Sequence, residues 1–232
     1  MRLFIVFILC YASFSVFSFQ VQPMVSEVQP LGSQSQQTIR IVNTSTSPLT
    51  VDISAYDLLI TEHGDESLRE NDEDFLIIPM TTIIPAGKSQ SVIVRYIGEP
   101  MLLASKAYRL MINQVNVALQ DKSTSGVGMS LSFRTLLNVV PKDAEAKLII
   151  KNKTQAAKDE WKVLLENTGN KYIRLSQATW VFKNNNEKLV LEGETLSKVL
   201  NGKLLLPNSS REVSIKIPAK FNAEQTELEV LF

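Results

Sequence analysis

The stretch over residues 127–141, VGMSLSFRTLLNVVP, restricts what this chain can fold into more than any other part of it. Apolar side chains recur there at every second position: Val127, Met129, Leu131 and Phe133. A period of two places these side chains on one face of a β-strand. From Leu136 the alternation gives way to an apolar run that Pro141 closes. The stretch is therefore either an inner strand of an all-β sandwich or a strand that offers its apolar face to another protein.

Residues 1–18 have the pattern of a signal peptide. Arg2 supplies a positive charge, an apolar stretch follows over residues 3–17, and Ser18 provides a small residue before a cleavage site. We therefore expect Phe19 to begin the exported chain. The apolar stretch is short for a membrane span, and no later stretch is long and apolar enough to cross a bilayer, so membrane insertion is not expected.

Composition narrows the class of protein. The formal net charge is +0 at pH 7, which gives no sign of a nucleic-acid or anionic-membrane partner. Cys10 is the single cysteine, so the exported chain has none, and core burial must stabilise it without disulfides. On typical domain sizes the remaining length suits two domains of about 100 residues each. We place them at residues 19–142 and 143–232, because the charge balance shifts toward lysine after Pro141.

Residues 62–74 form an acidic stretch in which Arg69 is the single basic residue. Clustered carboxylates suit calcium, but the spacing does not match an EF-hand loop, and a solvated surface loop is the simpler interpretation. His63, the only histidine, lies in this stretch. It gives no zinc site without cysteine beside it, and nothing in the sequence resembles a nucleophile elbow. We therefore expect no enzyme activity, no metal and no other cofactor.

Strand signals recur at short spacing along the chain, whereas helix signals are scarce. In the first half they cover residues 19–28, 38–42, 49–59, 91–96, 107–117 and 127–140. In the second half they cover residues 147–150, 161–165, 172–182, 189–191, 204–206, 213–217 and 226–232. The polar residues 118–126 join two segments into a predicted hairpin, and Pro23 makes the first segment an edge strand. The pattern predicts an all-β chain whose second half is a smaller sandwich, with Trp161 and Trp180 as core anchors.

The first half also carries an ordered set of segments. The set comprises Pro79, the turn IPAG at residues 84–87, the strand SVIVRY at residues 91–96, YRL at residues 108–110, and an alternating strand ending in Pro141. In order and spacing, this set resembles the first domain of periplasmic pilus-assembly chaperones of the chaperone–usher pathway. The similarity is clearest over residues 75–141, and looser agreement extends over residues 19–232.

This resemblance implies two immunoglobulin-like β-sandwich domains set at an angle, a location in the periplasm, and two partners, pilin subunits and an outer-membrane usher. In this family the last strand of domain 1 fills the groove of a subunit that lacks its own last strand, which is β-augmentation. The four alternating apolar residues would enter the subunit's pockets: Val127, Met129, Leu131 and Phe133. Ser130 and Ser132, on the opposite face, would stay outside the groove.

The family also holds the subunit's terminal carboxylate with basic residues, commonly one in the first strand and one in the last strand of domain 1. This sequence departs from that pattern in a way that looks like the archaic branch, because residues 19–28 contain no Lys or Arg and Leu136 is apolar. If the predicted hairpin turns around residue 123, Arg109 lies opposite about position 137, near the cleft between the domains. We therefore expect Arg109, helped by Arg134, to hold the carboxylate, since an arginine fork suits that task, with Arg95 as a weaker third candidate. The alternative is that these are ordinary surface arginines.

A secreted or cell-surface immunoglobulin-like module for binding or adhesion is the alternative function. Genomic context discriminates between the two, because a chaperone is expected to be encoded beside an usher and incomplete pilin subunits. An exported hydrolase has the least support from the residues.

Overall fold

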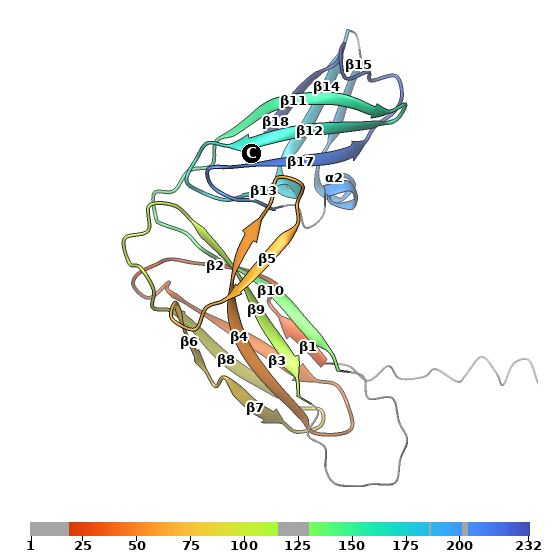
Figure 1. Cartoon of the computed structure of the whole chain (residues 1–232). Helices are drawn as coiled ribbons and strands as arrows, with labels where there is room; N and C mark the ends of the chain where they lie inside the picture. The colour runs from red at the N-terminus through yellow and green to blue at the C-terminus, as the bar shows by residue number, and fades with distance from the viewer. Residues whose placement is uncertain (1–18, 116–129, 186, 201–203) are drawn as a thin grey trace, which may run out of the picture.

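The computed structural model describes residues 19–115, 130–185, 187–200 and 204–232. Over these residues the chain is nearly all β, as predicted; the described helices are η1 (Leu175–Gln177) and α2 (Gly193–Leu200). Figure 1 shows two β-sheet bodies set at an angle. Each body has its own apolar core. We call residues 19–142 domain 1 and residues 143–232 domain 2, following the division predicted from the sequence.

Domain 1 consists of two packed sheets. The first has the strand order β1 (Phe19–Gln22), β3 (Gln36–Asn43), β8 (Ser89–Tyr96), β6 (Phe75–Ile78). The second has the order β2 (Val25–Val28), β10 (Ser132–Val139), β9 (Lys106–Gln114), β4 (Leu49–Ile60), β5 (Glu66–Glu70), with β7 (Thr81–Ile84) also paired to β4. Alternation explains the layers, because Val92, Val94 and Tyr96 of β8 are buried in the core while the residues between them are exposed.

The first predicted strand, residues 19–28, is two strands in the structure. β1 pairs antiparallel with β3 in one sheet, and β2 pairs parallel with β10 in the other. Pro23 lies between them, where its missing N–H interrupts the ladder. The prediction of an edge position is confirmed for both strands, whereas the prediction of one continuous strand is wrong.

The acidic stretch 62–74 gives a second correction. Its residues 66–70 form β5, which pairs antiparallel with β4 from Tyr56↔Glu70 to Ile60↔Glu66. The sequence conceals this strand because Leu68 is its only apolar residue. Leu68 packs against a cluster that includes Leu204 of domain 2, so its contact is made across the two domains rather than within a regular core. A loop was the wrong prediction for these five residues.

Domain 2 has the predicted sandwich character. One sheet has the order β11 (Leu148–Ala157), β12 (Glu160–Asn167), β17 (Ser209–Lys216), and another the order β15 (Glu187–Leu191), β14 (Thr179–Asn184), β18 (Glu227–Leu231). A short pair, β13 (Ile173–Arg174) and β16 (Leu204–Leu205), completes the described strands. Trp161 and Trp180 are fully buried in the core, which confirms their predicted role. Helix α2 was not predicted; Leu196 and Leu200 are its buried residues.

Candidate functional site

Strand β10 has an outer edge that is only partly occupied. On one side β9 pairs with β10 along its whole length, from Ser132↔Asn113 to Val139↔Lys106. On the other side β2 pairs with β10 only from Leu136↔Val25 to Val139↔Val28. Within the described ranges, no strand pairs with the outer edge of residues 131–135, the start of β10 and the residue before it. We call these residues the open edge of β10; they continue the stretch with which the sequence analysis began.

The main chain of the open edge points away from β9 at every second residue. Leu131 O accepts a hydrogen bond from Gln114 N of β9 at 2.9 Å, whereas Leu136 N donates to Met24 O on the β2 side at 2.9 Å. In an antiparallel ladder these directions alternate along the strand. The N–H and C=O groups of Ser132 and Arg134 therefore face outward, and an edge of this kind is a template for another strand.

The apolar side chains at the open edge are half-buried. Leu131 and Phe133 pack against the core of domain 1, and the Phe133 ring meets the Phe19 ring edge-on with centroids 4.7 Å apart. Both keep part of their surface exposed. Val127 and Met129, the other two predicted groove residues, lie outside the described residues. The structure thus shows Leu131 and Phe133 contacting their own domain while still presenting apolar surface at an unoccupied edge.

After Thr135, both faces of β10 are buried, and this is where the apolar run of the sequence lies. Leu136 is buried in a cluster with Leu58, Ala107 and Leu204, the last of which belongs to domain 2. Covering by domain 2 explains why alternation stops in the sequence at this point, since a strand buried on both faces reads as a continuous apolar run.

Arg109 lies close to its predicted position. The predicted hairpin is confirmed, and Arg109 pairs with Leu136, one residue from the expected position. Its side chain is only 19% exposed and forms an ion pair with Glu66 of β5, with Nη2 2.5 Å from Oε1 and Nε 3.2 Å from Oε2. The carboxylate that Arg109 binds in this structure is therefore one from its own domain.

Arg134 is placed differently. It lies on the open edge of β10, opposite Met111, and its side chain is exposed. Among the residues that the structure describes, no carboxylate forms an ion pair with it. Arg134 therefore offers a positive charge at the place where a further strand could bind.

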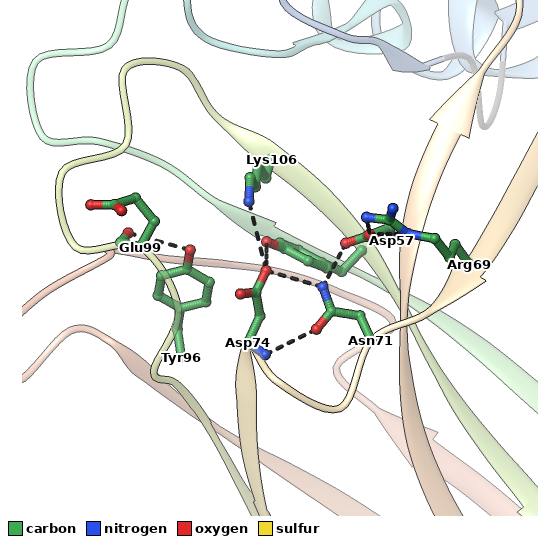
Figure 2. Close-up of polar contacts among 8 residues, drawn as sticks. Asp57, Arg69, Asn71, Asp74, Tyr96, Glu99 and Lys106 are labelled. Carbon is green, nitrogen blue, oxygen red and sulfur yellow. Dashed lines mark hydrogen bonds and ion pairs between the residues drawn. The ribbon is translucent and has the colours of Figure 1, made fainter.

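A polar cluster at the end of domain 1 facing domain 2 was missed in the sequence (Figure 2). Asp74 accepts hydrogen bonds from Tyr108 Oη at 2.7 Å and Asn71 Nδ2 at 3.1 Å, and Lys106 Nζ lies 3.7 Å from it. Burial, then the hydrogen bond to Asp74, raises the pKa of Tyr108, and burial raises the pKa of Tyr96 to about 12. Both phenols therefore stay protonated at neutral pH, so Tyr108 remains a donor to Asp74.

A cavity of about 450 Å³ opens beside this cluster, between the two domains. Its charged and polar lining comes from Asp57, Arg69, Ser105, Lys106 and Asn208. Arg69 pairs with Asp57, and Lys106 with Asp74, so both cations at the cavity already have carboxylate partners. These contacts stabilise the end of domain 1, and they do not indicate a catalytic or ligand-binding role for the cavity.

Two sandwiches at an angle, with the last strand of the first sandwich open at one edge, define the fold class: the chain has the two-domain fold of fimbrial chaperones. The class 5 fimbriae chaperone CfaA matches with a TM-score of 0.59 and 15% identity, over 93% of this chain and 99% of that one. A chain of the CsuC–CsuE chaperone–tip adhesion subunit pre-assembly complex, from archaic chaperone-usher Csu pili of Acinetobacter baumannii, matches with a TM-score of 0.59 and 15% identity, over 92% and 97%.

A third solved structure extends the comparison. A chain of the Salmonella enterica complex of SafA pilin with the SafB chaperone matches with a TM-score of 0.57 and 13% identity, over 94% of this chain and 99% of that one. No protein-family profile and no curated protein sequence matches the chain. At these identities the comparisons show the fold, and the function has to be argued from the open edge of β10.

Proposed function

We propose that the protein is a periplasmic chaperone of pilus assembly, without enzymatic activity, that binds pilin subunits and delivers them to an outer-membrane usher. The observation that carries this proposal is the open edge of β10, where outward main-chain groups lie beside the half-buried Leu131 and Phe133. Two of the similar structures are complexes of a chaperone with a pilin or a tip adhesion subunit, which supports the same kind of partner here.

The physical mechanism is strand addition. A subunit strand would bond to the outward main-chain groups of Ser132 and Arg134, which fixes its register. The apolar residues of the alternating stretch would fill pockets of the subunit: Val127, Met129, Leu131 and Phe133. Each such side chain is worth roughly 1.5–3 kcal/mol when fully buried. Leu131 and Phe133 are buried only in part in the free protein, so a share of this energy is still available for binding.

The ion pairing of the two candidate carboxylate anchors supports Arg134 over Arg109, the reverse of the order expected from the sequence. Arg109 already pairs with Glu66, so a subunit carboxylate would have to compete with an internal partner. Arg134 is exposed at the open edge, and it has no ion-pair partner in the described part of the chain. We propose that Arg134 binds the terminal carboxylate directly and that Arg109 contributes from its position beside Leu136.

Export is part of the proposal, and it rests on the signal-peptide pattern of residues 1–18, which lie outside the described residues. None of the described helices is long and apolar enough to cross a membrane. The periplasmic protein is expected to begin at Phe19, which mass spectrometry would show.

Co-purification tests the function as a whole. The chain is expressed together with the pilin subunit encoded beside it and is recovered from the periplasm through an affinity tag. A chaperone should bring down the subunit as a soluble stoichiometric complex, because the subunit alone lacks a strand and aggregates. An adhesion module of the same fold should come down without it, and that result would reject the proposed function.

A further inference from the structure

The hairpin of β4 and β5 leaves the sheet of domain 1. β4 pairs with β9 only as far as Asp57↔Tyr108, whereas its pairing with β5 continues to Ile60↔Glu66. Residues 58–68 therefore project as two strands, and no third strand of the described residues pairs with them; we call this segment the interdomain arm. Figure 1 shows it reaching toward domain 2. A two-stranded hairpin is only marginally stable by itself in water, so the arm needs a docking partner.

Domain 2 supplies that partner. Leu58 is buried with Leu204, and Ile60 and Leu68 pack against the same cluster. At the tip of the arm, Glu62 O accepts a hydrogen bond from Glu212 N at 2.8 Å. Glu212 belongs to β17, the edge strand of its sheet. The arm thus covers a sheet edge of domain 2 while domain 2 covers the apolar face of the arm.

A buried arginine of domain 2 lies against the turn of the arm. Arg211 is only 6% exposed; its Nη1 donates to Leu204 O at 2.5 Å, and its Nε has no hydrogen-bond partner among the described residues. A Cβ on Gly64 would lie 2.6 Å from Arg211 Nη2, so the turn is in direct contact with the guanidinium. Burial lowers the pKa of Arg211, and the nearby Glu66 carboxylate opposes this shift. A buried cation without a compensating partner destabilises the fold. Packing against the acidic arm therefore helps to stabilise Arg211 in its buried position.

We propose that the interdomain arm and Arg211 form a latch that fixes the orientation of domain 2 relative to β10. The apolar cluster holds the sides of the arm, and the Gly64–Arg211 contact with the Glu62–Glu212 hydrogen bond holds its tip. Arg211 acts here as a positioning residue. The latch is a property of the free protein, so it can be tested independently of the proposed binding of pilin subunits.

A matched pair of glycine variants tests the latch. Gly64 and Gly87 both have a positive φ, 93° and 68°, so any side chain strains either turn. At Gly87 a Cβ would meet nothing within 4 Å, whereas at Gly64 it would meet the buried guanidinium. Gly64→Leu should therefore push the arm off domain 2, and Gly87→Leu should not.

Electron-spin distance measurements report the orientation. Spin labels are attached at two exposed positions, through Ser91→Cys in domain 1 and Lys188→Cys in domain 2; the exported chain has no other cysteine to label. The parent and Gly87→Leu should give the same single narrow distance distribution, whereas Gly64→Leu should give a shifted or broadened one. Fluorescence of Trp161 and Trp180, both in the core of domain 2, checks that this domain stays folded.

Leu68→Ala is a second variant that tests the latch, and it leaves the turn at Gly64 and strand β17 unchanged. Leu68 lies outside the core of either domain, so its truncation should loosen the arm without unfolding either one. A broadened distribution in this variant supports the latch even where Gly64→Leu fails to fold. Parent-like distributions in folded Leu68→Ala and Gly64→Leu would overturn the proposal.

Discussion

Leu131→Asp is expected to abolish subunit capture while the protein remains folded. Leu131 is half-buried at the open edge of β10, so in the free protein the new carboxylate can turn toward solvent. In a complex it would have to enter an apolar pocket unpaired, which is strongly unfavourable. Losing the apolar contact alone should weaken capture about ten- to a hundred-fold, and the charge adds to this loss. A pull-down with purified subunit, normalised to folded chaperone, measures the effect.

Ser91→Asp is the control. It places the same charge at an exposed position of β8, in the other sheet and away from the open edge, and should capture the subunit nearly as the parent does. Leu131→Ala adds a thermal melt: its cost in stability should be less than the about 2–5 kcal/mol of a fully buried leucine, because the side chain is only partly covered. A large drop in the melting temperature of Leu131→Ala, with unchanged capture per folded molecule, would show that Leu131 serves the core of domain 1 and not subunit binding.

Arg134→Glu is expected to give the second large loss. If Arg134 holds the subunit's terminal carboxylate, reversing its charge removes the ion pair and adds repulsion. Truncating one partner of a buried, hydrogen-bonded ion pair costs about 2–5 kcal/mol, so, with the pair covered by the bound subunit, even Arg134→Ala should weaken capture roughly thirty-fold or more. The melting temperature should change little, because the side chain is exposed and has no ion-pair partner in the described part of the chain. Binding titrations with the purified subunit measure the loss.

Two comparisons make this assignment specific. Arg95→Glu, at an exposed position of β8 in the other sheet, should leave capture unchanged. Arg109→Ala should reduce capture less than Arg134→Ala, because Arg109 shares its charge with Glu66. The reverse order, with Arg109→Ala as the more damaging change, would contradict the preference for Arg134, and full capture by both variants would reject both assignments.

Much of the fold could be predicted because its strands carry strong alternation. The period of two in β8 identified its buried face, and the polar stretch 118–126 placed β9 and β10 in one hairpin. Two features could not be predicted this way. β5 has one apolar residue, Leu68, whose partners lie in the contact between the domains, and the split of residues 19–28 depends on two different sheets accepting its two halves.

The candidate site could be predicted only in part. Alternation shows which side chains share a face, but the open edge exists because β2 begins its pairing at Leu136, and no local pattern shows where a neighbouring strand begins. The pairing of Arg109 was hidden for a similar reason. Its partner Glu66 is 43 residues away and reaches it only through the arm formed by β4 and β5.

Single-residue amide exchange of β10, with and without bound subunit, tests the central claim most directly. In the free protein the amides of Phe133 and Thr135 should be protected by β9, while those of Ser132 and Arg134 face the open edge and should exchange fast. If a subunit strand adds to this edge, Ser132 and Arg134 should become protected in the complex. A complex in which these two amides still exchange as fast as in the free protein would contradict strand addition at β10.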